Sequence, residues 1–165
     1  MINAIFAIDN NGGMGSRGSL PWPHDSEDMR WFQRHNKNQI VVMGSATWLD
    51  PNMPSPLPNR INVVVSRKHL EDFPGADYVM NVNELDWGFK LIAQDYPDKT
   101  IWIIGGPRLL TISRNFIETA IVTHYNSDYG CDAILDTKSW FTNTEIQDES
   151  PGINKIFRKY KCKPI

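Results

Sequence analysis

The segment GSLPWPHDSEDMRWF (18–32) places Asp25, Glu27 and Asp28 within four residues of one another, next to bulky apolar side chains. All three acids fall in the first turn of a predicted helix, where each carboxylate stabilises the helix dipole by about 0.3–1 kcal/mol. Asp28 and Phe32 are four residues apart and therefore share one helix face. If this face is turned inward, Asp28 needs hydrogen-bond donors, and desolvation raises its pKa. The local pattern leaves two interpretations open: a helix start, or an acid that holds a ligand.

A second candidate site is the segment IWIIGGPRLL (101–110), in which an apolar strand runs into Gly105 and Gly106 and Pro107 then begins a helix. Proline suits the first helical turn, and glycine lets a ligand approach the backbone closely. Free N–H groups at a helix start favour phosphate, and Arg108 adds a positive charge. The plain alternative is a tight strand-to-helix turn, because the segment is neither GxGxxG nor a P-loop.

Two further strand ends carry small or donor-rich residues. In VVMGSATW (41–48), small residues lead from Gly44 to Thr47, and VVVSRK (63–68) ends in Ser66, Arg67 and Lys68, a corner suited to a phosphate monoester. Each is weak alone, since charged residues after a strand are usually solvated. Ligands in open α/β sheets bind at the carboxyl ends of strands, so three such ends together predict a dinucleotide site.

Residues 9–24 join the first strand to the acidic helix and contain four glycines. Long connections of this composition are either lids or disordered linkers. Three apolar residues, Met14, Leu20 and Trp22, favour a lid that packs over something.

The elements that must position these residues alternate along the chain. Helical patterns cover 25–36, 82–96 and 107–116. The strands are Ile- and Val-rich and nearly continuous, as expected when both sheet faces are buried, and they cover 2–8, 39–44, 61–66, 77–80, 100–106 and 119–125. This alternation predicts an α/β fold with a mainly parallel sheet.

The C-terminal segments NTEIQDE and NKIFRKYKCKP predict two further strands, with SPG as the turn between them. In the second strand, lysines alternate with Tyr160, Cys162 and Pro164. Lysine on an outer face protects sheet edges from aggregation, so we expect this strand to be an edge. A basic nucleic-acid patch is the alternative, but no aromatic platform accompanies the lysines.

The bulk composition narrows the function classes. A chain of 165 residues suits one domain, residues 1–165, and a net charge of −2 gives no reason to expect nucleic acid or a membrane as a partner. Its apolar runs are too short to span a bilayer. The only cysteines, Cys131 and Cys162, lack metal-type spacing and predict reduced thiols in a cytoplasmic protein, and the scattered histidines predict no metal site.

Taken together and in this order, the motifs resemble the dihydrofolate reductase family over nearly the whole chain. The motifs are MG and LPW (14–22), DMRWF (28–32), VMGSATW (42–48), PLPNR (56–60), VVVSR (63–67), IIGGPRLL (103–110) and THY (123–125). The resemblance implies a doubly wound, mostly parallel eight-stranded sheet with flanking helices and an antiparallel C-terminal strand. It also implies NADPH-dependent reduction of 7,8-dihydrofolate to tetrahydrofolate, binding of antifolates such as methotrexate, and a monomer.

By resemblance, Asp28 accepts hydrogen bonds from the pterin 2-amino group and ring N–H, Thr123 assists, and Trp22 belongs to the catalytic lid. Hydride passes to pterin C6, and N5 is protonated through water near Asp28. Arg60 clamps the glutamate α-carboxylate of the substrate. The other implied substrate contacts are Ile5, Ala7, Met29, Phe32 and Leu57. The implied cofactor contacts are Ala7, Met14, Gly15, Leu20, Gly44, Ser45, Ala46, Thr47, Ser66, Arg67, Ile104, Gly105, Gly106, Pro107, Arg108 and Leu109, and the glycine pair is expected to have a cis peptide.

Several positions depart from the family pattern. Ser45 stands where members often carry a basic residue for the 2′-phosphate, a task that passes to Arg67, so the preference for NADPH over NADH stays open. Leu110 replaces an aromatic or hydroxyl residue, and the acids beside Asp28 raise its pKa by repulsion. Two alternatives remain: a catalytically weak member that acts as a cofactor-binding or structural protein, and the related reductase of the riboflavin pathway.

Overall fold

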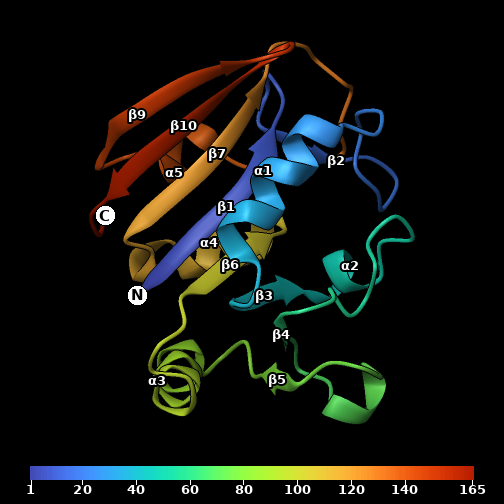
Figure 1. Cartoon of the computed structure of the whole chain (residues 1–165), viewed down its shortest axis with the longest axis vertical. Coiled ribbons are helices and arrows are strands. Elements are labelled where there is room, and N and C mark those ends of the chain that lie inside the picture. The colour runs from blue at the N-terminus through green and yellow to red at the C-terminus, as the bar shows by residue number, and fades with distance from the viewer.

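An eight-stranded sheet forms the centre of the computed structural model, which describes residues 1–165 (Figure 1). Its strand order is β5 (Tyr78–Met80), β4 (Ile61–Val65), β3 (Ile40–Gly44), β6 (Ile101–Gly105), β1 (Ile2–Ile8), β7 (Thr119–Tyr125), β10 (Lys155–Cys162) and β9 (Thr144–Gly152). The first six strands are parallel, and β10 runs antiparallel to both β7 and β9. The predicted mostly parallel sheet with an antiparallel C-terminal strand is confirmed.

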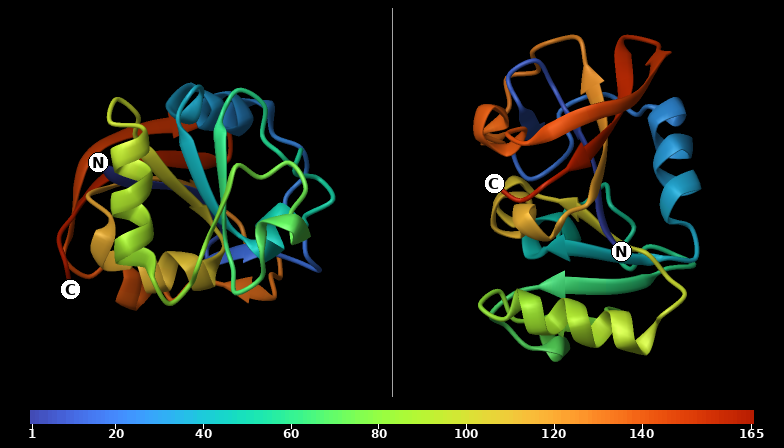
Figure 2. Two further views of the ribbon diagram at one scale, coloured as in Figure 1. Left: turned by 90° about the horizontal axis from the view of Figure 1, so that it is seen from below. Right: turned by 90° about the vertical axis from the view of Figure 1, so that its left-hand side faces the viewer.

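Helices cover both faces of this sheet. They are α1 (Ser26–Asn36), α2 (Ser45–Trp48), α3 (Leu85–Asp95), α4 (Pro107–Ser113) and α5 (Thr137–Trp140). Alternate residues of each strand point to opposite faces, so Phe6 joins a core of 22 buried residues with α3, α4 and α5, whereas Ile5 joins a core of 10. Trp31 and Phe32 of α1 pack against the smaller core. Figure 2 shows α1 and α5 on opposite sides of the sheet.

Helix α1 begins where the sequence indicated. Asp25 is the N-cap, and its side chain accepts a hydrogen bond from the Asp28 N–H at 3.1 Å. The first turn is acidic and the last turn carries Arg34 and His35, in agreement with the helix dipole. Asn36 is the only buried residue of this helix. The packing of α1 therefore relies on half-buried side chains beside the sheet.

A second, two-stranded sheet ties down the Gly-rich segment 9–24. β2 (Gly13–Gly15) pairs with β8 (Ala133–Ile134), and neither strand was predicted. The buried Asp9 carboxylate supports the junction because it accepts hydrogen bonds from Asn11 N, Gly13 N, Tyr129 N and Cys131 Sγ.

The C-terminal strands correct the sequence analysis in two respects. The strand at the edge is β9, whereas β10 pairs on both sides, so the prediction that the lysine-bearing strand is an edge was wrong. The alternation of lysines with less polar residues indicated which side chains of β10 face solvent, but it carried no information on which strands pair with β10. SPG is not the turn either: β9 continues to Gly152, and Pro151 is tolerated because an edge strand leaves one side unpaired. The turn is Ile153–Asn154, with Asn154 at φ 63°.

The predicted helices differ from the observed ones mainly in where they begin and end. The helix expected over 107–116 ends at Ser113 and continues as a 3-10 turn, Arg114–Phe116, while α2 and α5 were not predicted. A second 3-10 turn covers Leu70–Asp72. None of the helices combines the length and apolar composition that crossing a membrane requires.

Candidate active site

Asp28 faces β7 across the smaller core. Thr123 Oγ1, on a buried threonine of β7, donates a hydrogen bond to Asp28 Oδ1 at 2.7 Å. Burial raises the pKa of Asp28, the bond from Thr123 opposes this rise, and the charge of Asp25 adds to it. Glu27 points away to Lys155, so the expected repulsion comes from Asp25 and is secondary to burial. Asp28 is thus a half-buried carboxylate with one protein donor and further lone pairs available.

Trp22 holds the end of segment 9–24 against the sheet beside this acid. Its ring stacks on Tyr125, with centroids 4.4 Å apart and planes 24° apart, and it is only 7% exposed. Tyr125 OH in turn donates to Asp25 Oδ2 at 2.8 Å. The tryptophan of the LPW motif is therefore connected to the start of α1 through one tyrosine, a contact that was not predicted from the sequence.

The residues predicted to enclose a substrate come from three elements. Ile5 and Ala7 lie on β1, and Phe32 lies on α1. Leu57 is buried in the loop before β4, whereas Met29 is 43% exposed. Figure 1 shows α1 lying across β1. Four of these five side chains are therefore at least partly buried in the region between α1 and the sheet.

Arg60 has a free donor in the same region. Its Nε is buried and has no hydrogen-bond partner, burial lowers its pKa, and its guanidinium lies 6.0 Å from the Phe32 ring centre. The buried Asn62 shapes this loop: it accepts from Leu57 N at 2.9 Å and donates to the carbonyls of Leu57 and Arg60. Asn62 was not predicted as a site residue, although a single amide inside the apolar strand INVVV was a visible signal.

The glycine pair lies where β3, β6 and segment 9–24 meet. Gly105 has φ +134°, which side chains rarely adopt, and its peptide to Gly106 is cis, as expected. A Cβ at Gly105 would lie 3.6 Å from Met14 Cε and 3.8 Å from Thr47 Oγ1. At Gly44, a Cβ would lie 3.8 Å from the Gly105 carbonyl oxygen. Any larger residue would fill the space that the bare backbone leaves open.

The remaining predicted cofactor residues have different exposures. Ile104 and Leu109 are buried, while Ala46 and Arg108 are exposed. Ser45 is half-buried, and Pro107 occupies the first position of α4. Leu110, which also departs from the family pattern, is fully buried in the larger core. The Leu110 side chain therefore contributes to the packing of the larger core.

The third strand end forms a basic corner. Ser66, Arg67, Lys68 and His69 line a cavity of about 400 Å³ together with Tyr78 and its neighbours. Ser66 Oγ accepts the Lys68 N–H at 3.0 Å, which folds the chain tightly after β4. The cavity thus gathers several hydrogen-bond donors at the carboxyl ends of β4 and β5.

The lid residues behave unequally. Met14 and Trp22 pack against the protein itself, whereas Leu20 is 53% exposed and has its side chain free to cover a ligand. The lid is held through Asp132, which accepts Arg17 N at 3.1 Å and donates its own N–H to the Gly15 carbonyl at 3.0 Å. Asp132 was not predicted because it lies 115 residues from Arg17 along the chain.

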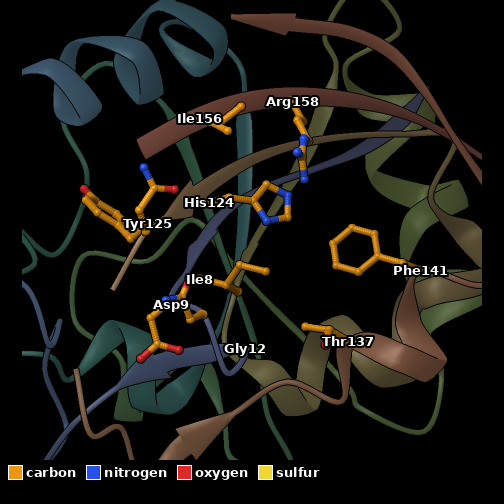
Figure 3. A pocket seen from close by; sticks show the side chains of 11 residues that line it. Ile8, Asp9, Gly12, His124, Tyr125, Thr137, Phe141, Ile156 and Arg158 are labelled. Carbon is orange, nitrogen blue, oxygen red and sulfur yellow. The ribbon is translucent and has the colours of Figure 1, made fainter. Parts of the chain in front are cut away.

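A separate cavity of about 280 Å³ opens on the opposite face, and none of the predicted site residues lines it (Figure 3). His124 and Arg158 point into it, and His124 Nε2 bonds Tyr160 OH at 2.8 Å. Burial and Arg158 lower the pKa of His124 to about 4. A neutral histidine in a shared hydrogen bond is a structural group here.

Comparisons with known proteins agree with the motifs. The family model described as "Dihydrofolate reductase" matches residues 1–161. The viral dihydrofolate reductase of Saimiriine herpesvirus 2 (strain 488) is 37% identical, covering 93% of this chain and 76% of that protein. The dihydrofolate reductase of Gallus gallus is 32% identical, and the match covers 97% of this chain and 95% of that protein. A solved structure of dihydrofolate reductase from Enterococcus faecalis, complexed with NADP(H) and RAB-propyl, matches with a TM-score of 0.82. The match covers 98% of this chain and 95% of that chain, and at 24% identity it shows the fold alone.

Proposed function

The chain belongs to the dihydrofolate reductase family, and from this premise we propose that it reduces 7,8-dihydrofolate to 5,6,7,8-tetrahydrofolate with NADPH. Hydride is transferred to C6 of the pterin and N5 is protonated. The observation that carries this proposal is the half-buried Asp28 carboxylate, held by Thr123 at 2.7 Å beside the half-buried Phe32.

Asp28 is the acid that orients the pterin. A carboxylate offers about four lone-pair sites, so Asp28 can accept from Thr123 and also from the 2-amino group and ring N–H of the substrate. Such a paired contact fixes the ring in one orientation. Burial raises the pKa of Asp28 toward the range in which a proton is readily held and released near N5.

The rest of the substrate follows the residues that lead outward from Asp28. Ile5, Ala7, Phe32 and Leu57 supply apolar contacts to the pterin and benzoyl rings, with Met29 at the exposed rim. Arg60 binds the α-carboxylate of the glutamate, because its buried Nε has no partner within the protein. A buried donor of this kind is costly unless a ligand satisfies it.

The strand ends fit a dinucleotide. NADPH supplies the hydride when bound. The bare backbone at Gly44, Gly105 and Gly106 allows close approach of a phosphate-bearing chain. Trp22 belongs to the catalytic lid over them. The remaining proposed cofactor contacts are Ala7, Met14, Gly15, Leu20, Ser45, Ala46, Thr47, Ser66, Arg67, Ile104, Pro107, Arg108 and Leu109.

We further propose that residues 1–165 act as one domain and as a monomer in the cytoplasm, without nucleic acid or membrane partners. The single-domain proposal is supported by β1 and β10, which come from opposite ends of the chain and both pair with β7. The net charge of −2 supports the absence of nucleic acid and anionic membranes as partners.

Turnover by Asp28→Asn tests the proposal. The wild type is expected to oxidise NADPH only when dihydrofolate is present, and Asp28→Asn is expected to lower kcat/KM about 10²–10⁴-fold because the proton-holding group is lost. The measurement is the decay of NADPH absorbance, with NADPH affinity followed by fluorescence. Asp98→Asn, on an exposed loop, is the matched control.

Absence of turnover by the wild type, or an Asp28→Asn variant as active as the control, would contradict the proposal. Cofactor binding without turnover would instead favour the weak binding or structural member. Reduction of a riboflavin-pathway intermediate in place of dihydrofolate would favour the related reductase.

A further inference from the structure

Lys155, the first residue of β10, is a buried cation near the active-site acid. Its side chain is 3% exposed. Nζ lies 2.7 Å from Glu27 Oε1, 3.1 Å from Asp25 Oδ2 and 2.6 Å from the Ile153 carbonyl oxygen. An ammonium group has three donors, so these contacts use all of them. Two of the three acids at the start of α1 are thus paired with one lysine from the far end of the chain.

Asp25 transmits this contact to Asp28 and to the lid. Its Oδ1 accepts the Asp28 N–H at 3.1 Å and caps α1, while its Oδ2 also accepts Tyr125 OH at 2.8 Å. The Tyr125 ring supports Trp22 on one side and lies 5.7 Å from Lys155 Nζ. Lys155, Asp25 and Tyr125 therefore connect the first turn of α1, the sheet and the end of the lid.

We propose that Lys155 is a positioning residue for Asp28, which fixes the first turn of α1 through Asp25 and neutralises the carboxylates beside the catalytic acid. The effect on turnover rests on the proposed function, whereas the effect on Asp28 itself does not. No sequence pattern pointed to this lysine, because it reads as one of several alternating lysines in β10.

Electrostatics explain why the site needs such a cation. The groups facing Asp28 are Asp25 on α1, Thr123 and Tyr125 on β7, and Lys155 on β10. Burial and the charge of Asp25 raise the pKa of Asp28, while the bond from Thr123 and the charge of Lys155 lower it. Without Lys155, three carboxylates would stand within four residues with no counter-charge, and like charges favour the protonated form.

A purely structural role for Lys155 makes different predictions. Buried ion pairs are weak evidence for stability, because desolvation can cancel the attraction between the charges. A structural lysine would change the melting temperature and leave the titration of Asp28 where it was. The deciding measurement must therefore follow Asp28 itself.

The first variant is Lys155→Met, which keeps the apolar stem and removes the charge. The carboxyl resonance of Asp28 is titrated by NMR in ¹³C-aspartate-labelled, ligand-free protein, and the midpoint is expected to rise by about 1 pH unit. The apparent pKa that the acid limb of the pH profile of kcat/KM reports is expected to rise by the same amount. Lys155→Arg should restore most of the shift, and Lys161→Met, exposed on the same strand, should cause none.

The second variant, Asp25→Asn, keeps the helix cap and Lys155 while removing the nearest like charge. The Asp28 midpoint is expected to fall, which checks that the charge of Asp25 reaches Asp28. If Lys155→Met does not fold, Lys155→Gln, which removes the charge and keeps hydrogen-bond donors, decides the matter by a rise of the Asp28 midpoint. A lower melting temperature with an unmoved Asp28 titration in both variants would overturn the proposal. A wild type without turnover would contradict the proposed function alone, since the titration needs no substrate.

Discussion

At the scale of the single residue, the ionised Asp28 side chain lowers the free energy of unfolding. Because burial raises its pKa above the unfolded value, the folded state holds this proton more strongly than the unfolded chain. Its contribution to stability is therefore complete below the unfolded pKa and is lost as the pH rises through the folded pKa. At neutral pH the ionised, half-buried Asp28 carboxylate therefore destabilises the fold that positions it.

His124 should make stability fall on the acid side of neutrality. Its pKa is about 4 in the fold and 6.5 in the unfolded chain, so between these values the unfolded state binds more protons and stability rises with pH. We expect His124→Gln to reduce the loss of unfolding free energy between pH 7 and pH 4.5 by up to about 3 kcal/mol. Urea denaturation at both pH values measures this, with His24→Gln as the exposed control. Equal losses in wild type and His124→Gln would refute it.

Arg67 should determine the cofactor preference. A charged hydrogen bond is worth about 1.5–3 kcal/mol, so Arg67→Ala is expected to lower the ratio of kcat/KM for NADPH over NADH by about 10–100-fold. Arg108→Ala, at the glycine pair, is the matched control and should weaken both cofactors alike. Steady-state kinetics with each cofactor gives the ratio, and an unchanged ratio in Arg67→Ala would show that the 2′-phosphate lies elsewhere.

The residues of the site were predictable to very different degrees. Asp28, Arg60 and the glycine pair lie in local motifs with recognisable chemistry. Asn62 and Lys155 act through partners that only the folded chain brings near, and Asp132 contacts Arg17 across 115 residues. Local patterns reveal which groups can react, whereas the groups that orient them depend on tertiary contacts.

At the scale of elements, the middle of segment 9–24 is held by the short β2–β8 ladder and by the Asp132 carboxylate. Asp132→Ala removes the acceptor of Arg17 N, an exposed hydrogen bond worth about 1 kcal/mol. We expect trypsin to cleave after Arg17 about fivefold faster in this variant, because local opening becomes easier. Asp132→Asn keeps an acceptor and is the matched control. Mass spectrometry measures the rate of cleavage after Arg17. A rate in Asp132→Ala equal to that of the wild type would contradict the prediction.

The long elements were predictable and the short ones were not. Six apolar runs gave the six parallel strands, because both faces of those strands are buried. β2 has three residues and β8 has two, too short for any periodicity to appear. The edge was misassigned because alternating lysines indicate a solvent-facing side and carry no information on pairing.

At the scale of the whole molecule, ligands should stabilise the fold in proportion to their occupancy. A ligand that binds only the folded state adds about 2.7 kcal/mol at 100 times its Kd. Methotrexate and NADPH are therefore each expected to raise the melting temperature by several degrees, measured by differential scanning fluorimetry. Asp28→Asn should abolish most of the methotrexate shift and keep the NADPH shift. No shift with either compound at saturation would exclude the proposed pterin and cofactor sites.

The central position of β1 has a consequence for how the protein is made. During synthesis β1 emerges before its partners, because it pairs with residues 101–103 on one side and 119–124 on the other. Its backbone groups therefore wait for the synthesis of residues 101–103 and then of residues 119–124, and such long-range pairing is intrinsically slow. The newly made N-terminal half exposes an unpaired apolar strand throughout that interval, a period in which a chain of this topology is vulnerable to aggregation and gains from chaperones.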